Sequence, residues 1–245
     1  MHHFTYDKLI LFGDSITQGA FQSDFSFTLG NALQGDYIRK FDVLDRGYGG
    51  YNARWGKEIL PEILATESKN ATIKLVVIFY GTNDCKANEQ GVGIEEYKKT
   101  LLFMVELCEK YNTKAIVVGP AVYSAALGNP SDASSMEAHL KYSNAAKEVA
   151  ERCNVPFVDL WHAFTSYLGS TEEEMLKSPA DMSELLVDGV HFAPIGYKIF
   201  HQALTNTITT AYPELAKENV RERLVPWNEV DESNIKKSIF KHESF

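Results

Sequence analysis

The feature that most constrains the fold is an alternation between five short apolar runs and longer segments with helical periodicity. The apolar runs cover residues 9–12, 41–44, 74–80, 115–120 and 155–160, and the helical segments cover residues 26–37, 54–64, 93–111, 136–153 and 194–211. The run at 74–80 (KLVVIFY) is almost continuously apolar, as expected for a strand that is buried on both faces of a parallel sheet. Strands that alternate with helices in this way are typical of a doubly wound fold. We therefore predict an α/β fold of three layers, α/β/α, around a five-stranded parallel sheet.

The chain of 245 residues contains no linker rich in Pro, Ser or Gly, which indicates one domain. We place this domain at residues 1–211. Residues 212–245 are charged and lose helical periodicity, so we expect an arm that packs on the domain or on a second subunit, as in a homodimer. Residues 121–135 and 161–187 are predicted to be irregular segments that leave strand ends and shape a pocket. The sequence leaves open whether the segment 161–187 closes as a lid.

The charge and the cysteine content narrow the class of protein. The net charge is −9 and no basic cluster is present, so nucleic acid is not an expected partner. The three cysteines are scattered and have no metal-binding spacing, which suits a reducing compartment. No apolar stretch approaches the roughly 20 residues of a membrane span, and residues 9–12 are too few for the core of a signal peptide. We expect a cytoplasmic protein that uses neither a metal nor another cofactor.

A serine, an aspartate and a histidine stand where the chain leaves the first predicted strand or enters the last predicted helix. Ser15 follows the first strand, at the edge where open α/β sheets bind ligands. Asp188 and His191 come just before the last helix. With this spacing the Asp188 carboxylate can hold one ring nitrogen of His191 while the other nitrogen faces Ser15. The pattern predicts a serine nucleophile, a histidine base and an aspartate that orients the base.

Two more residues at the same predicted edge are candidates for stabilising an oxyanion. Gly50 follows the second strand in a glycine-rich turn and has no side chain to block a substrate oxygen. Asn83 follows the third strand and carries a neutral amide donor. With the backbone N–H of Ser15 these residues predict an oxyanion hole, in which losing one donor typically costs on the order of 10²–10³ in rate.

Four blocks of the sequence resemble the signature blocks of the SGNH hydrolases, also called the GDSL esterase/lipase family. The blocks are residues 13–19 (GDSITQG), Gly50, residues 81–84 (GTND) and residues 188–191 (DGVH), and they occur in the same order as in the family. Within that family, segments 54–64 and 196–201 resemble the isoamyl acetate-hydrolysing esterase branch. The resemblance implies a flavodoxin-like SGNH hydrolase fold and a serine esterase that cleaves small, apolar carboxylic esters, such as isoamyl acetate, through an acyl-enzyme.

The resemblance also implies the same site residues: Ser15 as nucleophile, His191 as base, Asp188 as its partner, and Gly50 and Asn83 as oxyanion donors. A carbohydrate O-acetylesterase and a lysophospholipase or thioesterase remain alternatives, because the pocket lining decides the substrate on such a fold. A non-catalytic module that holds an anion is an alternative from another class.

Other residues near the blocks also have predicted roles. Tyr48, Tyr123 and Phe192 flank the candidate catalytic positions in sequence, and we predict that they line an apolar pocket for substrate. Cys85 adjoins the site without an apparent base, so we predict a packing or bystander role for it. Ala193 stands where family members often have a Ser, Thr or Asn that caps the last helix.

Overall fold

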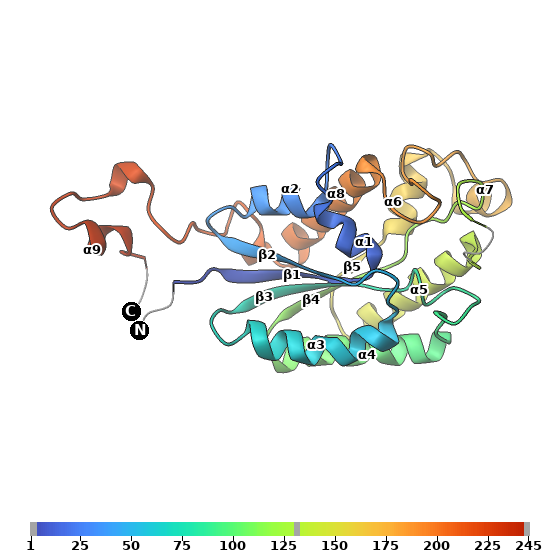
Figure 1. The fold of residues 1–245 in the computed structure, drawn as a ribbon, viewed down its shortest axis with the longest axis horizontal. Helices are drawn as coiled ribbons and strands as arrows, with labels where there is room; N and C mark the ends of the chain where they lie inside the picture. The colour runs from blue at the N-terminus through green and yellow to red at the C-terminus, as the bar shows by residue number, and fades with distance from the viewer. Residues whose placement is uncertain (1–3, 130–132, 243–245) are drawn as a thin grey trace.

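A parallel sheet of five strands runs through the middle of the molecule (Figure 1). The computed structural model describes residues 4–129 and 133–242. The strands are β1 (Asp7–Gly13), β2 (Phe41–Gly47), β3 (Ile73–Phe79), β4 (Lys114–Val118) and β5 (Phe157–Val158), in the spatial order β2-β1-β3-β4-β5. Every neighbouring pair is parallel, which confirms the predicted sheet. The chain order reverses beside β1, and a crevice outside the strand ends at such a point is where ligands bind in this class of fold.

Helices cover both faces of the sheet (Figure 1). On one face lie α1 (Ser15–Gln18), α2 (Leu29–Asp36), α6 (Leu160–Tyr167) and α8 (Pro194–Ala211), and on the other lie α3 (Ala53–Glu67), α4 (Ile94–Lys110) and α5 (Met136–Arg152). Because side chains alternate along a strand, Leu9 and Leu11 of β1 join one hydrophobic core while Ile10 and Phe12 join the other. The predicted three-layer architecture is confirmed.

The segment 161–187 differs from the prediction, because it contains two helices. The strand β5 has two residues, and Asp159 then caps α6 by accepting a hydrogen bond from the His162 N–H. A second helix, α7 (Glu172–Lys177), begins at a capping box in which Thr171 and Glu174 satisfy each other's backbone N–H groups. The apolar residues of this segment include the buried Trp161, so its helices belong to the core and not to an irregular loop.

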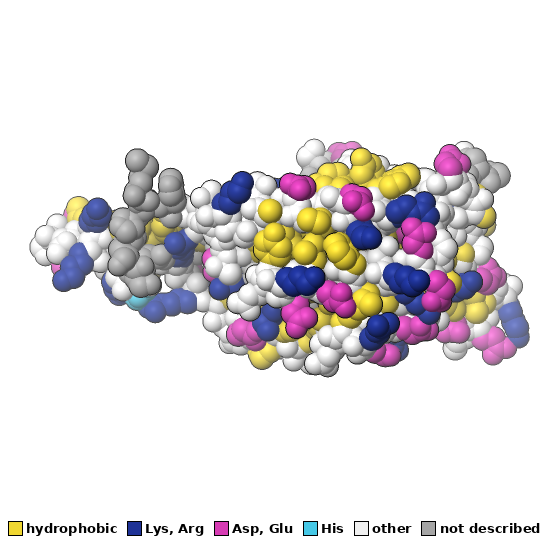
Figure 2. Space-filling view, turned by 90° about the horizontal axis from the view of Figure 1, so that it is seen from below, with side chains coloured by type: hydrophobic (Ala, Val, Ile, Leu, Met, Phe, Trp, Pro, Cys, Tyr) yellow, Lys and Arg dark blue, Asp and Glu magenta, His cyan; other side chains and the backbone are white. Residues whose placement is uncertain are grey.

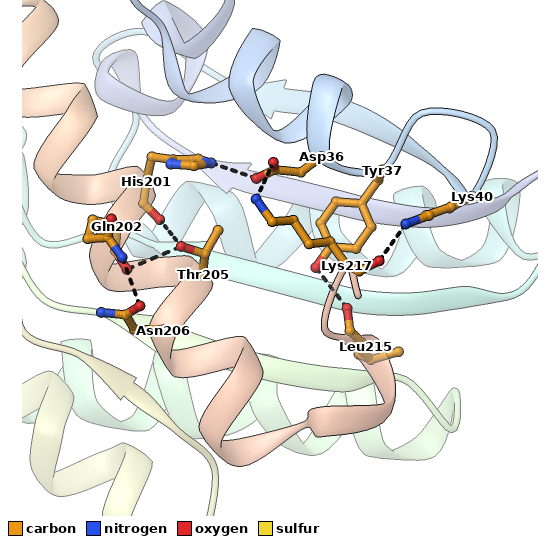
Figure 3. A network of polar contacts seen from close by, with 9 residues as sticks. All are labelled: Asp36, Tyr37, Lys40, His201, Gln202, Thr205, Asn206, Leu215 and Lys217. Carbon is orange, nitrogen blue, oxygen red and sulfur yellow. Dashed lines mark hydrogen bonds and ion pairs between the residues drawn. The ribbon is translucent and has the colours of Figure 1, made fainter. Parts of the chain in front are cut away.

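The first part of the C-terminal arm lies against the domain, and the rest projects away from it (Figure 1). Figure 3 shows that Asp36 at the end of α2 accepts hydrogen bonds from His201 of α8 (2.8 Å) and Lys217 of the arm (2.7 Å). Tyr37 donates to the Leu215 carbonyl at 2.8 Å. Lys217 and Leu215 thus fix the start of the arm to the end of α2, which His201 links to α8.

Beyond residue 225 the arm contains the 3₁₀ turn η4 (Trp227–Glu229) and the short helix α9 (Ile235–Ile239). Phe240 packs edge-on against Phe4, so α9 lies beside the segment that precedes β1. The Trp227 side chain is 88% exposed. This part of the arm therefore buries little apolar surface against its own domain.

The outer face of the α3, α4 and α5 layer carries apolar side chains among Lys, Arg, Asp and Glu (Figure 2). Ile59, Leu102 and Phe103 of this layer are half-buried and pack against the core beneath them. Within residues 4–129 and 133–242, no helix is long and apolar enough to cross a membrane.

Candidate active site

Ser15 is positioned by the tight passage from β1 into α1. A Cβ on Gly13 would come within 2.4 Å of the Phe79 carbonyl oxygen, so only glycine allows the strands to approach this closely. The buried Asp14 then caps α1, because its Oδ1 accepts a hydrogen bond of 2.9 Å from the Ile16 N–H. Ser15 is the first residue of the helix and lies at the carboxyl edge of the sheet.

The turn before α8 positions Asp188 and His191. Asp188 Oδ1 accepts hydrogen bonds from the Val190 N–H (3.1 Å) and the His191 N–H (2.9 Å). Gly189 has a positive φ of 87°, and its carbonyl accepts a hydrogen bond of 3.0 Å from the Ser124 N–H. The turn is therefore fixed both within itself and against the segment that follows β4.

The structure brings the serine, histidine and aspartate together. His191 Nε2 lies 2.8 Å from Ser15 Oγ, and His191 Nδ1 lies 2.7 Å from Asp188 Oδ2. An ionised carboxylate can only accept a hydrogen bond, so Nδ1 carries the proton and Nε2 presents its lone pair to the Ser15 hydroxyl. This arrangement can take a proton from the hydroxyl as the serine oxygen attacks a carbonyl carbon.

The Asp188 carboxyl is held in its ionised form. Partial burial acts to raise its pKa, but the hydrogen bonds from the His191 N–H and ring, together with that from Val190, lower the pKa below its ordinary value. Two neighbouring carboxyls behave in the opposite way: burial raises the pKa of Asp14 to about 6 and that of Asp84 to about 7. Of the three carboxyls, only Asp188 contacts His191 directly.

Gly50 and Asn83 both lie beside Ser15 on a small cavity. Gly50 has a positive φ of 79°, a conformation that side chains disfavour. The Asn83 side chain donates one N–H to the Tyr51 carbonyl at 2.8 Å, which fixes the amide plane. A primary amide has a second N–H, and Asn83 lines the cavity.

The cavity beside Ser15 has a volume of about 170 Å³. It is lined by Ser15, Gly50, Asn83, Lys86, Gln90, Asp188, Val190 and His191. Sequence reasoning missed Lys86 and Gln90, although both lie in the loop that leaves the carboxyl end of β3. A much larger hollow of about 1230 Å³ lies at the opposite edge of the sheet, beneath the start of the arm, and none of the candidate catalytic residues lines it.

The aromatic residues predicted to line the pocket lie elsewhere. Phe192 is 1% exposed and packs among Phe164 and Tyr197 in the core. The buried Tyr123 packs against the His139 ring, and Tyr48 packs against Phe12. None of the three lines the cavity. Burying their apolar rings between the sheet and the helices stabilises the fold more than exposing them in a cavity would. Nearness in sequence was therefore a poor guide to the pocket lining.

Cys85, which we predicted to have a packing or bystander role, is buried. Its thiol lies 3.3 Å from the Thr82 carbonyl, and burial raises its pKa to about 12. Ala193, as the sequence suggested, gives α8 no side-chain cap. In the described part of the chain, no group of three or more His, Cys, Asp or Glu side chains is arranged to hold a metal ion.

Comparison with known proteins agrees with this geometry. Residues 11–199 match the model of the GDSL-like Lipase/Acylhydrolase family, and they span every candidate site residue. The chain belongs to this family. As a GDSL hydrolase it is a carboxylic ester hydrolase, and the resemblance seen in the sequence is confirmed.

Relatives of this GDSL hydrolase include esterases of yeast and human. It is 36% identical to an isoamyl acetate-hydrolyzing esterase of Saccharomyces cerevisiae, over 94% of this chain and 98% of that protein. It is 30% identical to the isoamyl acetate-hydrolyzing esterase 1 homolog of Homo sapiens, over 78% of this chain and 77% of that protein.

Two solved structures have the same fold. A lipase/acylhydrolase from Enterococcus faecalis matches with a TM-score of 0.67 at 22% identity, covering 89% of this chain and all of that one (100%). A mutant of Axe2, an acetyl-xylooligosaccharide esterase of Geobacillus, matches with a TM-score of 0.64 at 23% identity, covering 85% of this chain and 96% of that one.

Proposed function

We propose that this GDSL hydrolase is a serine esterase that cleaves small acetate esters, such as isoamyl acetate, through an acyl-enzyme. The observation that carries the proposal is the hydrogen-bonded series from Ser15 Oγ through His191 (2.8 Å) to Asp188 (2.7 Å) beside a small cavity. A histidine that only stabilised the start of α8 would not require a serine hydroxyl beside its Nε2 atom.

In the proposed mechanism, Ser15 Oγ attacks the ester carbonyl carbon while His191 Nε2 takes the hydroxyl proton. The resulting imidazolium is stabilised by Asp188, and the oxyanion is bound by the N–H groups of Ser15, Gly50 and Asn83. The tetrahedral intermediate expels the alcohol, which leaves with the proton from His191. A water molecule then gives its proton to His191 and attacks the acyl-enzyme, and acetate leaves as Ser15 regains its proton.

The size of the cavity supports a short acyl group. Its 170 Å³ is smaller than the roughly 300–1,000 Å³ typical of pockets for drug-sized ligands. A medium-chain alcohol would extend from the cavity towards solvent. The yeast relative, named for isoamyl acetate, has 36% of its aligned residues in common with this chain, which supports the same substrate class.

A carbohydrate O-acetylesterase is a second candidate, and one observation favours it. The cavity wall includes Lys86 and Gln90, which hydrogen-bond to one another, and the predicted aromatic residues are absent from that wall. A polar wall can hydrogen-bond to the hydroxyl groups of an acetylated sugar, and the aliphatic part of isoamyl acetate has no such groups.

The test is hydrolysis of p-nitrophenyl esters from acetyl to dodecanoyl by the native enzyme and by Ser15→Ala. We expect the highest rate on the acetyl ester and a loss of all hydrolysis in the variant. Isoamyl acetate and an acetylated xylo-oligosaccharide, compared by kcat/KM, then separate the two candidates. A maximum on long acyl chains would contradict the acetate-ester proposal.

We further propose that the enzyme forms a homodimer through its arm. The support is the exposure of Trp227 (88%) and Ile235 (48%) on a segment that projects from the domain. Light scattering after size exclusion should give twice the chain mass of 27.5 kDa, and Trp227→Ser should reduce it to a single chain. Tyr167→Ser, an exposed aromatic on α6, is the matched control and should remain dimeric. A native enzyme of single-chain mass would refute this proposal.

A further inference from the structure

The loop around Gly50 has to aim one peptide N–H at the oxyanion. That N–H belongs to the peptide between Gly49 and Gly50, two residues without side chains. Glycine has more backbone freedom than any other residue, so this peptide rotates more easily than one between residues with side chains. On the amino side the Gly49 N–H is fixed, because it donates to the Gln18 side chain at 2.8 Å.

On the carboxyl side the peptide is fixed by Gln90. The Gln90 Nε2 group donates to the Gly50 carbonyl at 2.7 Å. The Gln90 main chain contributes as well, because its carbonyl accepts a hydrogen bond of 2.7 Å from the Asn52 side chain. One residue thus contacts the loop at two successive places.

The orientation of the Gln90 amide is decided by Lys86. The Lys86 ammonium lies 3.2 Å from Gln90 Oε1, and an ammonium group can only donate. The amide oxygen must therefore face Lys86, so that the amide N–H faces the Gly50 carbonyl. The Gln90 backbone is itself held, because its N–H donates to the Asn88 side chain at 3.0 Å.

We propose that Gln90, oriented by Lys86, is a positioning residue that sets the direction of the Gly50 N–H in the oxyanion hole. The bonds of the Gly49 N–H and the Gly50 carbonyl restrict the rotation of the peptide between them. This inference rests on the proposed esterase function and adds to it two residues outside the four signature blocks. Gln90 does not touch the reacting atoms but acts through Gly50.

The reaction step that depends on this position is formation of the oxyanion. An oxyanion donor that points away loses the transition-state interaction and leaves ground-state binding of the ester nearly unchanged. Losing a donor outright costs on the order of 10²–10³ in rate, so a misdirected donor should lower kcat by about 10- to 100-fold with KM within about twofold.

The experiment compares Gln90→Leu, Gln90→Glu and Lys86→Met with the native enzyme on p-nitrophenyl acetate. Leucine removes the amide and glutamate places an acceptor against the Gly50 carbonyl, so both should lower kcat, and Lys86→Met should lower it less. The matched control is Gln202→Leu, because Gln202 is an exposed glutamine on α8 whose amide contacts Asn206. The control should keep the native kcat.

A second measurement separates positioning from a merely structural role. A trifluoromethyl ketone forms a tetrahedral adduct with an active serine, and its oxyanion occupies the same hole. Its inhibition constant should rise in proportion to the fall in kcat, while the melting temperatures of the variants remain close to that of the native enzyme.

Unchanged kcat in both Gln90 variants, or a lower kcat with unchanged ketone inhibition, would overturn the inference and leave the esterase proposal intact. Absence of ester hydrolysis by the native enzyme would instead refute the proposed function itself.

Discussion

The molecule contains two Asp-x-x-His pairs with almost the same local geometry. In the first, His191 Nδ1 lies 2.7 Å from Asp188, whose other oxygen accepts the His191 backbone N–H at 2.9 Å. In the second, His162 Nδ1 lies 2.9 Å from Asp159, whose other oxygen accepts the His162 backbone N–H at 3.0 Å. The two histidine side chains are 42% and 44% exposed, so exposure does not distinguish them either.

The two pairs differ at the far ring nitrogen. His191 Nε2 faces the Ser15 hydroxyl at 2.8 Å, whereas His162 Nε2 faces the Glu172 carboxylate at 3.2 Å. A hydroxyl can give up a proton and become a nucleophile, but a second carboxylate offers only another acceptor. The second pair caps α6 and links it to α7, so the same motif serves structure in one place and is proposed to serve chemistry in the other.

Removing each histidine in turn is the strongest way to break the comparison. His191→Ala should lower kcat on p-nitrophenyl acetate by at least about 10⁴-fold, because His191 is the base that hydrogen-bonds to the Ser15 hydroxyl. His162→Ala should keep the native rate within about twofold, as substitutions away from a site usually do. Equal losses of kcat in the two variants, measured after both are shown to be folded, would contradict this comparison. They would mean that the partner of the histidine Nε2 atom does not decide whether the histidine is catalytic.

Removing each carboxylate charge is the next largest test. Asp188→Asn should lower kcat by about 10²- to 10⁴-fold, because the amide no longer stabilises the imidazolium and permits the wrong ring orientation. Asp159→Asn should leave kcat within about twofold of native, since asparagine also caps helices. Both kcat values are measured by steady-state kinetics. A lower kcat for Asp159→Asn than for Asp188→Asn would contradict the assignment of the catalytic role to the Asp188 pair.

Asp14 adjoins Ser15 and belongs to neither Asp-x-x-His pair. It should have a smaller effect, on how the free energy of unfolding depends on pH. Burial raises the pKa of Asp14 to about 6, so the folded protein holds a proton that the unfolded chain releases. A raised carboxyl pKa means that stability is greatest below the unfolded pKa and falls as the pH rises towards the folded pKa. Between pH 5 and pH 8 this group should lower the free energy of unfolding by about 1 kcal/mol.

The variant Asp14→Asn retains the cap on α1 and cannot ionise. Its free energy of unfolding, measured by urea denaturation at the two pH values, should therefore fall less between them than that of the native enzyme. Equal falls in the two proteins would show that Asp14 does not take up a proton on folding.

The smallest predicted effect is the contribution of the Asp188 charge to stability. Its pKa is lowered in the folded protein, so its stabilisation is present above the unfolded pKa of about 3.9 and is lost as the pH falls through the folded pKa. Because the side chain is 53% exposed, Asp188→Asn should lower the free energy of unfolding at pH 7 by less than about 1 kcal/mol. Below the folded pKa of Asp188, urea denaturation should give the variant and the native enzyme the same free energy of unfolding. A lower value for the variant at that pH would mean that the loss comes from packing and not from the charge.

Much of the fold and the core of the candidate site could be predicted from sequence. The apolar runs located all five strands, and α8 begins and ends where its periodicity predicted, at Pro194 and Ala211. Ser15, Gly50, Asn83, Asp188 and His191 all lie on one cavity, as the strand-end positions suggested. Strand ends are reliable guides because parallel strands bring their carboxyl ends to one edge.

The pocket wall could not be predicted in this way. Lys86 and Gln90 reach the cavity because the loop after β3 folds back over Gly50, and no pattern in residues 85–92 indicates that path. Phe192 lies next to His191 in sequence but points into the core, because successive residues of an extended segment face opposite sides.

The sequence by itself determined the local geometry of each Asp-x-x-His pair. These hydrogen bonds join residues that are three apart, so the backbone of a single turn suffices to form them. Only the tertiary structure decided which pair faces a serine. Ser15 lies 176 residues from His191, and the two meet because the parallel sheet and the packing of α8 bring β1 and the turn before α8 to the same edge.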